Sequence, residues 1–240
     1  MKDNIKEIIE SIKKLQQFGY SDDDIVEEFE SKILKANSLP LSFFFAKNVK
    51  KANIQAHGQV ILNSGDLDYN YQFAYYVEGA DVQAHGKVII DSKDLDYNYK
   101  FARDVEGADV KAHGKVILNS KDLNYNYQFA CYVEGANVKA HGKIIINSKD
   151  LNYNYKFAKD ILSADIQAHG KVVIESQDLD YNYKFIRDVV GSDIQAHENV
   201  IKNGKNIFYK KKIMDLKERV SHQVSVDDDY SDKITQYKEE

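Results

Sequence analysis

The chain has 240 residues, of which 43% are apolar and 30% are charged, and its formal net charge is −5. This composition predicts a folded protein and excludes a disordered chain or one built mainly to grip phosphate backbones. A single cysteine, Cys131, excludes a disulfide framework and a cysteine-based zinc cluster, and predicts a cytoplasmic, reducing (intracellular) setting.

Residues 1–24 alternate charged and apolar side chains at helical spacing, which predicts an amphipathic capping helix. Ser21 and Asp24 then form a capping-box-like start for the next helix. This segment has no uninterrupted apolar run like that of a signal peptide, and no window of the chain reaches 18 apolar residues. We therefore expect no membrane partner.

From Ile25 the sequence repeats itself every 28 residues, without a slip in register. Such a period is typical of a solenoid, in which stacked neighbours bury the face that each unit leaves open. We number the seven copies repeats 1 to 7; they span 25–52, 53–80, 81–108, 109–136, 137–164, 165–192 and 193–220.

Each repeat is predicted to hold two short helices. In repeat 3 these run from about Val82 to Asp91 and from about Leu95 to Glu106, with Asp81 and Asp94 as N-caps. Gly107 can adopt the left-handed conformation that ends the second helix. In that second helix Leu95, Tyr99, Ala102 and Val105 are expected to form the core stripe, flanked by Phe101.

A strand-and-helix repeat is the alternative, because "KVII" is rich in β-branched residues and Gly86 weakens a helix. The matching segment of repeat 1, "IVEEFESKIL", favours a helix instead. The predicted fold class is therefore all-α: a right-handed α/α solenoid of seven two-helix repeats with helical N- and C-terminal caps. Residues 221–240 are predicted to be a polar, acidic and disordered tail.

A histidine recurs in phase, followed in most copies by glycine. On a helical wheel His85 shares a side with Val82 and Ile89, so the histidines are predicted to pack inward and to hydrogen-bond a carbonyl or a neighbouring side chain. A metal ladder is disfavoured, because stacked repeats place equivalent positions about 10 Å apart. We expect no metal and no cofactor, and leave open a loss of stability in acid. The histidines are His57, His85, His113, His141, His169 and His197.

An asparagine ladder runs through the second helices and is also predicted to point inward. A buried amide without partners costs about 1–3 kcal/mol, so each should bond a backbone group of its own or an adjacent repeat. The members are Asn70, Asn98, Asn126, Asn154 and Asn182, and Ser42 stands at this position in repeat 1.

Tyrosines stand on the predicted outer surface of the second helices, where the copies diverge most. Exposed tyrosines on a charged surface are favoured anchors for a protein partner. The candidate partner-binding residues are Tyr75, Tyr76, Tyr97, Tyr132 and Tyr153.

Repeat 5 carries a net charge of +3, whereas its neighbours are neutral or acidic. This gives the alternative of a nucleic-acid-binding helical-repeat protein. The lysines concerned are Lys139, Lys143, Lys149, Lys156 and Lys159.

The stretch "YNYKFARDVEGADV" resembles the tandem α-helical repeats of about 28 residues found in bacterial, phage and large-virus proteins, and is similar to minimal HEAT-like α-solenoid units. The likeness covers residues 25–220. It implies a packing pattern and carries over no catalytic or cofactor residue.

The same groups recur in series, whereas catalysis needs unlike groups that converge, and Cys131 and His222 lie far apart in the chain. The sequence therefore favours a non-enzymatic protein–protein interaction module, such as a scaffold, adaptor or inhibitor.

Overall fold

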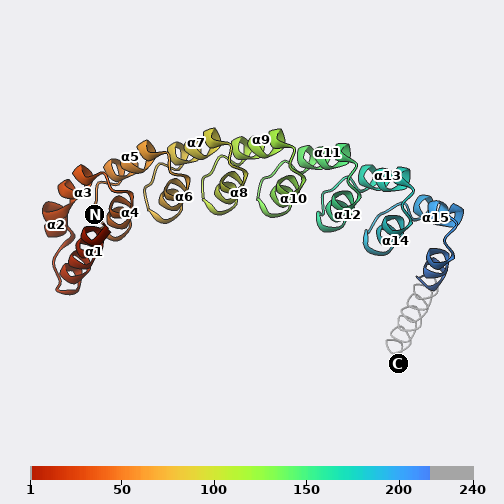
Figure 1. Ribbon diagram of the computed structural model, residues 1–240, viewed down its shortest axis with the longest axis horizontal. Coiled ribbons are helices and arrows are strands. Elements are labelled where there is room, and N and C mark those ends of the chain that lie inside the picture. Colours follow the sequence, from red (N-terminus) through yellow and green to blue (C-terminus); the bar gives the residue numbers. More distant parts are fainter. Residues whose placement is uncertain (1, 217–240) are drawn as a thin grey trace, which may run out of the picture. The chain divides into compact units, whose positions relative to one another are not determined.

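The computed structural model describes residues 2–216 and shows helices, turns and loops but no strand within that range (Figure 1). The all-α prediction is confirmed, and the strand-and-helix alternative is wrong. The chain divides into two compact units, Met1–Asn137 and Val138–Glu240, and each is described by itself. The predicted tail, 221–240, lies outside the described residues.

Unit 1 holds the capping segment and repeats 1 to 4. Its elements are α1 (Lys2–Gln17), α2 (Asp22–Ile25), the π-helix η1 (Val26–Glu30), α3 (Ser31–Ala36), α4 (Leu39–Asn48), α5 (Ile54–Ser64), α6 (Leu67–Tyr76), α7 (Val82–Ser92), α8 (Leu95–Asp104), α9 (Val110–Ser120) and α10 (Leu123–Tyr132).

Unit 2 follows the same plan. Its elements are α11 (Val138–Ser148), α12 (Leu151–Asp160), α13 (Ile166–Ser176), α14 (Leu179–Asp188) and α15 (Ile194–Asn203), and residues 207–216 are again helical. None of the helices described is long and apolar enough to cross a membrane.

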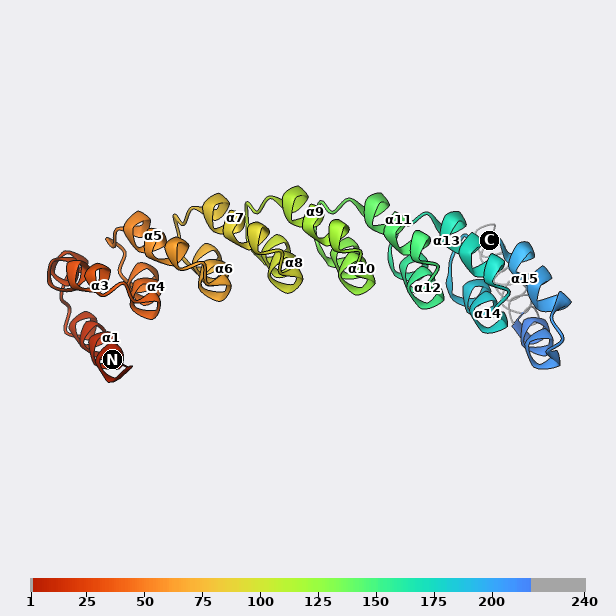
Figure 2. The same cartoon turned by 45° about the horizontal axis from the view of Figure 1, so that its top comes forward.

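Within each unit the helices form two layers (Figures 1 and 2). From repeat 2 on, the A layer contains the first helix of each repeat: α5, α7 and α9 in unit 1, and α11, α13 and α15 in unit 2. The B layer contains the second helices: α4, α6, α8 and α10, and then α12 and α14. Within each unit a B helix packs more extensively on the A helix of the following repeat than on its own, as α8 does on α9; this holds for α4, α6, α8, α12 and α14. The joint between repeats is therefore the main packing interface.

Both predicted N-caps of repeat 3 are confirmed. The Asp81 carboxylate accepts from the Ala84 backbone N–H at 2.9 Å, and Asp94 accepts from Tyr97 at 3.0 Å. The second helix ends at Asp104, two residues earlier than predicted, because Val105 is extended. Gly107 is left-handed as predicted (φ +78°), but it lies in the turn after the helix and does not end it.

The B-helix phenylalanine lies at the centre of the core. Phe101 is fully buried, whereas Leu95 is only half-buried, so the prediction that Phe101 flanks a Leu95 stripe is wrong. Tyr99, Ala102 and Val105 are buried as predicted. The 100° wheel failed here because α8 is covered on two sides, by its own A helix and by the next one.

The N-terminal cap closes the open side of repeat 1. Helix α1 contacts α4 and places Ile12 in a core with Phe45. The predicted capping box is confirmed, because Ser21 N–H donates to Asp24 at 3.0 Å and Asp24 N–H donates to Ser21 Oγ at 3.2 Å.

Candidate functional site

The repeated histidine, asparagine and glycine meet at the joints between repeats. At the joint of repeats 3 and 4, His113 of α9 faces Asn98 of α8 and Gly86 of α7, and all three residues are buried. We call such a set an internal joint. The prediction that the histidines and asparagines point inward is confirmed.

Each asparagine amide is saturated. Asn98 Nδ2 donates to the carbonyls of Ile89 at 2.9 Å and Asp94 at 2.6 Å, and its Oδ1 lies 2.8 Å from His113 Nδ1. The predicted bonds to backbone groups are thus present. The same His–Asn pair recurs at 2.7–2.8 Å in His85–Asn70, His169–Asn154 and His197–Asn182.

This geometry sets the protonation state of the imidazole. Because the amide nitrogen donates to two carbonyls, Oδ1 is left to accept, and His113 Nδ1 must carry the proton. Its Nε2 has no hydrogen-bond partner among the described residues. Burial lowers the pKa of His113 to about 4, so the ring is neutral at pH 7. The pKa values of His85, His141, His169 and His197 are lowered by burial to about 4 as well.

The glycine makes room for two rings. A Cβ on Gly86 would lie 3.1 Å from Phe101 Cε1 of its own repeat and 3.4 Å from His113 Nε2 of the next. Those rings pack against each other with centroids 4.9 Å apart. Close packing of these two rings therefore leaves little room for a side chain at Gly86.

An internal joint offers little to a reactant, because its imidazole is neutral and fully buried. Within residues 2–216 no three His, Cys, Asp or Glu side chains gather as a metal ion would require. The histidines and asparagines thus hold neighbouring repeats in register.

The first joint, between repeats 1 and 2, differs. Ser42 replaces the asparagine, and Glu30 replaces the glycine. Glu30 Oε1 accepts from Asn53 N–H at 2.6 Å and lies 3.4 Å from His57 Nε2. His57 Nδ1 and Ser42 Oγ are buried without a hydrogen-bond partner in the described residues. Burial lowers the pKa of His57, and the Glu30 carboxylate partly opposes that shift.

The predicted partner-binding tyrosines fall into two groups. Tyr75, Tyr76 and Tyr132 are exposed by 46%, 50% and 59%. Tyr97 and Tyr153 are only half-buried, and Tyr97 packs edge-on against Tyr71 with centroids 6.5 Å apart. Edge-to-face contacts of this kind recur between repeats, as in Tyr99–Tyr125 and Tyr155–Tyr181.

An aromatic patch covers α4 and α6 in unit 1; we define it as Phe43, Lys47, Tyr75 and Tyr76. Tyr76 packs edge-on against Tyr75, with centroids 4.6 Å apart, and lies 6.4 Å from Phe43. Lys47 Nζ stands 3.9 Å from the centre of the Tyr76 ring, a cation–π contact.

Repeats 3 and 6 hold an arginine–aspartate pair where repeat 2 holds Tyr75 and Tyr76. Asp104 accepts from the Tyr71 hydroxyl at 3.0 Å, and Arg103 donates to Tyr99 at 3.1 Å. The Arg103 guanidinium is the main cause that lowers the pKa of Asp104. These charged groups are satisfied inside the B layer. The sequence alone did not predict this hydrogen-bond network, because Tyr71 and Asp104 belong to different repeats.

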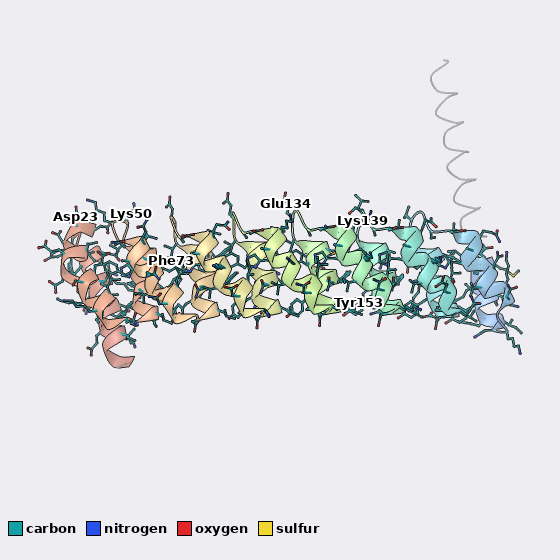
Figure 3. The ribbon with its side chains drawn as sticks, turned by 90° about the horizontal axis from the view of Figure 1, so that it is seen from above. Asp23, Lys50, Phe73, Glu134, Lys139 and Tyr153 are labelled. Atoms are coloured by element: carbon teal, nitrogen blue, oxygen red, sulfur yellow. The ribbon has the colours of Figure 1, made fainter. Side chains whose placement is uncertain are left out.

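The five lysines of repeat 5 do not form one patch. Lys139, Lys143 and Lys149 belong to α11 and its C-cap, in the A layer. Lys156 and Lys159 belong to α12 and lie 5.7 Å from the ring centres of Tyr153 and Tyr155. Figure 3 shows Lys139 and Tyr153 at opposite edges of unit 2.

No family model matches this sequence, and no curated protein or solved structure shows significant similarity to it. What is established is an array of paired helices with a His–Asn contact that recurs every 28 residues.

Proposed function

We propose that the protein is a non-enzymatic interaction module that presents the B layer of unit 1 to a protein partner. The observation that carries this proposal is the exposure of Tyr75 and Tyr76. Repeats 3 and 6 hold a hydrogen-bonded arginine–aspartate pair at these positions. Tyrosine anchors bury a large rigid ring at a low entropic cost and are enriched in binding hot spots.

The aromatic patch has the composition of an interface core. Tyr75 stacks on Tyr71, with centroids 5.9 Å apart and an interplanar angle of 6°. The cation–π contact with Lys47 restrains the Tyr76 ring. Rings held in this way lose little freedom when a partner covers them. Tyr132 of α10 is also exposed and occupies the position of Tyr76, but the Arg103–Asp104 pair of α8 separates it from the aromatic patch.

The test is affinity capture from a lysate of the source organism, with nuclease added. The informative variant is Tyr75→Arg with Tyr76→Asp, because repeats 3 and 6 carry Arg and Asp at these positions. We expect a discrete protein captured by the wild type to be lost, with binding at least about tenfold weaker.

The matched control is Arg103→Lys, since repeat 5 carries Lys159 at that position. This control should retain the partner. The proposal is wrong if the tyrosine variant captures the partner as well as the wild type does, or if nuclease treatment releases everything that was captured.

A further inference from the structure

The A layer of unit 1 contains an open groove of about 590 Å³ between α7 and α9. Ile90, Leu95 and Val116 supply its apolar side chains, and Lys93 and Lys115 stand on its lining. Asp91 is the one carboxylate among its lining residues. The groove is thus aliphatic inside and mainly basic at its margin.

Unit 2 has the same groove at the equivalent place, between α11 and α13, with a volume of about 470 Å³. Ile146, Leu151 and Val172 replace the three aliphatic residues, and Lys149 and Lys171 replace the two lysines. Its one carboxylate, Glu175, lies 3.8 Å from Lys171. The groove is therefore a property of the repeat and not of one irregular loop.

The lysines at the groove of unit 1 are available to a partner. Lys93 and Lys115 are exposed, and neither forms an ion pair with a described side chain. Helix α9 and its C-cap contribute three lysines (Lys111, Lys115 and Lys121) and no acidic residue. The net charge of a whole repeat hid this, because apart from Asp91 of α7 the acidic residues of repeats 3 and 4 lie in the caps, loops and B helices.

The chemistry of the groove selects its occupant. Single-stranded nucleic acids stack their bases on aromatic side chains, and the lining of this groove contains none. Aliphatic floors accept leucine, isoleucine or valine side chains, and lysines at the margin pair with carboxylates. We infer that each A-layer groove binds an acidic protein segment whose aliphatic side chains enter that groove.

This inference rests on the proposed function only in taking the partner to be a protein, since it concerns the layer opposite to the aromatic patch. The probe is a fluorescent peptide, Asp-Asp-Leu-Asp-Leu-Asp-Asp, whose binding to the full chain is followed by anisotropy. A peptide with serine in place of both leucines tests the aliphatic floor. An oligothymidylate tests nucleic acid as the occupant.

The informative variant replaces Lys93, Lys115, Lys149 and Lys171 by glutamine, the residue that repeats 2 or 6 carry at these positions as Gln59 and Gln177. The matched control replaces four lysines by glutamine, one each in α8, α12, α14 and the helical segment 207–216; repeats 2 and 4 carry glutamine there as Gln72 and Gln128. These control positions are Lys100, Lys156, Lys184 and Lys212. Both variants lose the same charge, so general electrostatic attraction falls equally.

We expect the groove variant and the serine peptide each to weaken binding about tenfold or more, and the control variant to weaken it by less than about threefold. Equal losses in the two lysine variants, an unchanged affinity for the serine peptide, or tighter binding of the oligothymidylate would each overturn the inference. The serine peptide keeps the test decisive even if a lysine variant folds poorly. The tyrosine variant should bind the peptide as the wild type does, which separates this result from that of the proposed function.

Discussion

The first joint and the internal joints of unit 1 solve one packing problem with different residues. At the joint of repeats 3 and 4, Asn98 accepts from His113 Nδ1, and Gly86 leaves room for the ring. At the first joint Ser42 leaves His57 Nδ1 without a hydrogen-bond partner in the described residues, and the Glu30 carboxylate approaches Nε2 instead. The neighbouring polar group thus lies at Nδ1 in the internal joints, where it forms a hydrogen bond, and 3.4 Å from Nε2 at the first joint, where it does not.

The residue at the glycine position distinguishes the first and last repeats from the others. Glutamate stands at the glycine position only in repeats 1 and 7, as Glu30 and Glu198. The π-helix η1 ends at Glu30, whose carboxylate lies 3.4 Å from His57 Nε2. The Glu198 side chain is 2% exposed and pairs with Lys202 at 2.9 Å.

Acid should have the largest effect on the internal joints. The internal histidines have folded pKa values of about 4, so below pH 6.5 the unfolded chain binds protons that the folded chain does not. Stability is therefore kept above pH 6.5 and falls from there toward pH 4, by about 2 kcal/mol per histidine at pH 5. Thermal melts at pH 7.5, 6 and 5 measure this. His113→Phe, the residue of repeat 1 (Phe29), should reduce the pH dependence, and a melting temperature that does not change with pH would contradict the account.

Asn98→Leu should break an internal joint. It removes a buried acceptor from His113 and two donors from the carbonyls of Ile89 and Asp94. We expect a loss of about 3 kcal/mol in the free energy of unfolding, measured in urea. Asn124→Leu, on the exposed side of α10, should change it by less than about 0.5 kcal/mol. Similar losses in the two variants would show that an asparagine of the ladder contributes no more to the free energy of unfolding than an exposed asparagine does.

Glycine to alanine tests how tightly each joint is packed. At Gly86 the new methyl group would lie 3.1 Å from the fully buried Phe101, whereas at Gly58 it would lie 3.3 Å from Phe73 and 3.6 Å from His85. Alanine also favours the helix by about 1 kcal/mol. We expect Gly86→Ala to destabilise by about 1–2 kcal/mol and Gly58→Ala to be nearly neutral. The reverse order in urea unfolding would show that packing at the glycine does not decide the outcome.

The smallest effect is expected at the ends of the A helices. Lys121 adopts a left-handed conformation (φ +58°), and repeat 2 uses Gly65 there (φ +66°). Lys121→Gly should therefore stabilise the protein by up to about 1 kcal/mol. Lys115→Gly, in the middle of α9, should destabilise it by about the same amount. A destabilising Lys121→Gly would show that the lysine side chain contributes more than the backbone strain costs.

Much of this arrangement could be predicted from the sequence. The period predicted two helices in each repeat, and the phase of the histidines and asparagines predicted that both point inward. Glu30 beside His57 was missed, because the contact joins residues 27 positions apart in a degenerate repeat. The left-handed Lys93 was missed as well, because lysine gives no turn signal. The Tyr71–Asp104 hydrogen bond and the A-layer grooves depend on the helix face on which each side chain lies. The net charge of a whole repeat does not contain that information.

The most direct test of the central claim is nitrogen NMR of the protein labelled with ¹⁵N-histidine. The account predicts that His85, His113, His169 and His197 are neutral, carry the proton on Nδ1, and keep this state at pH 5.5. His57 should differ from them, with its proton directed toward Glu30. Internal histidines that carry the proton on Nε2, or that become charged at pH 5.5, would contradict the account.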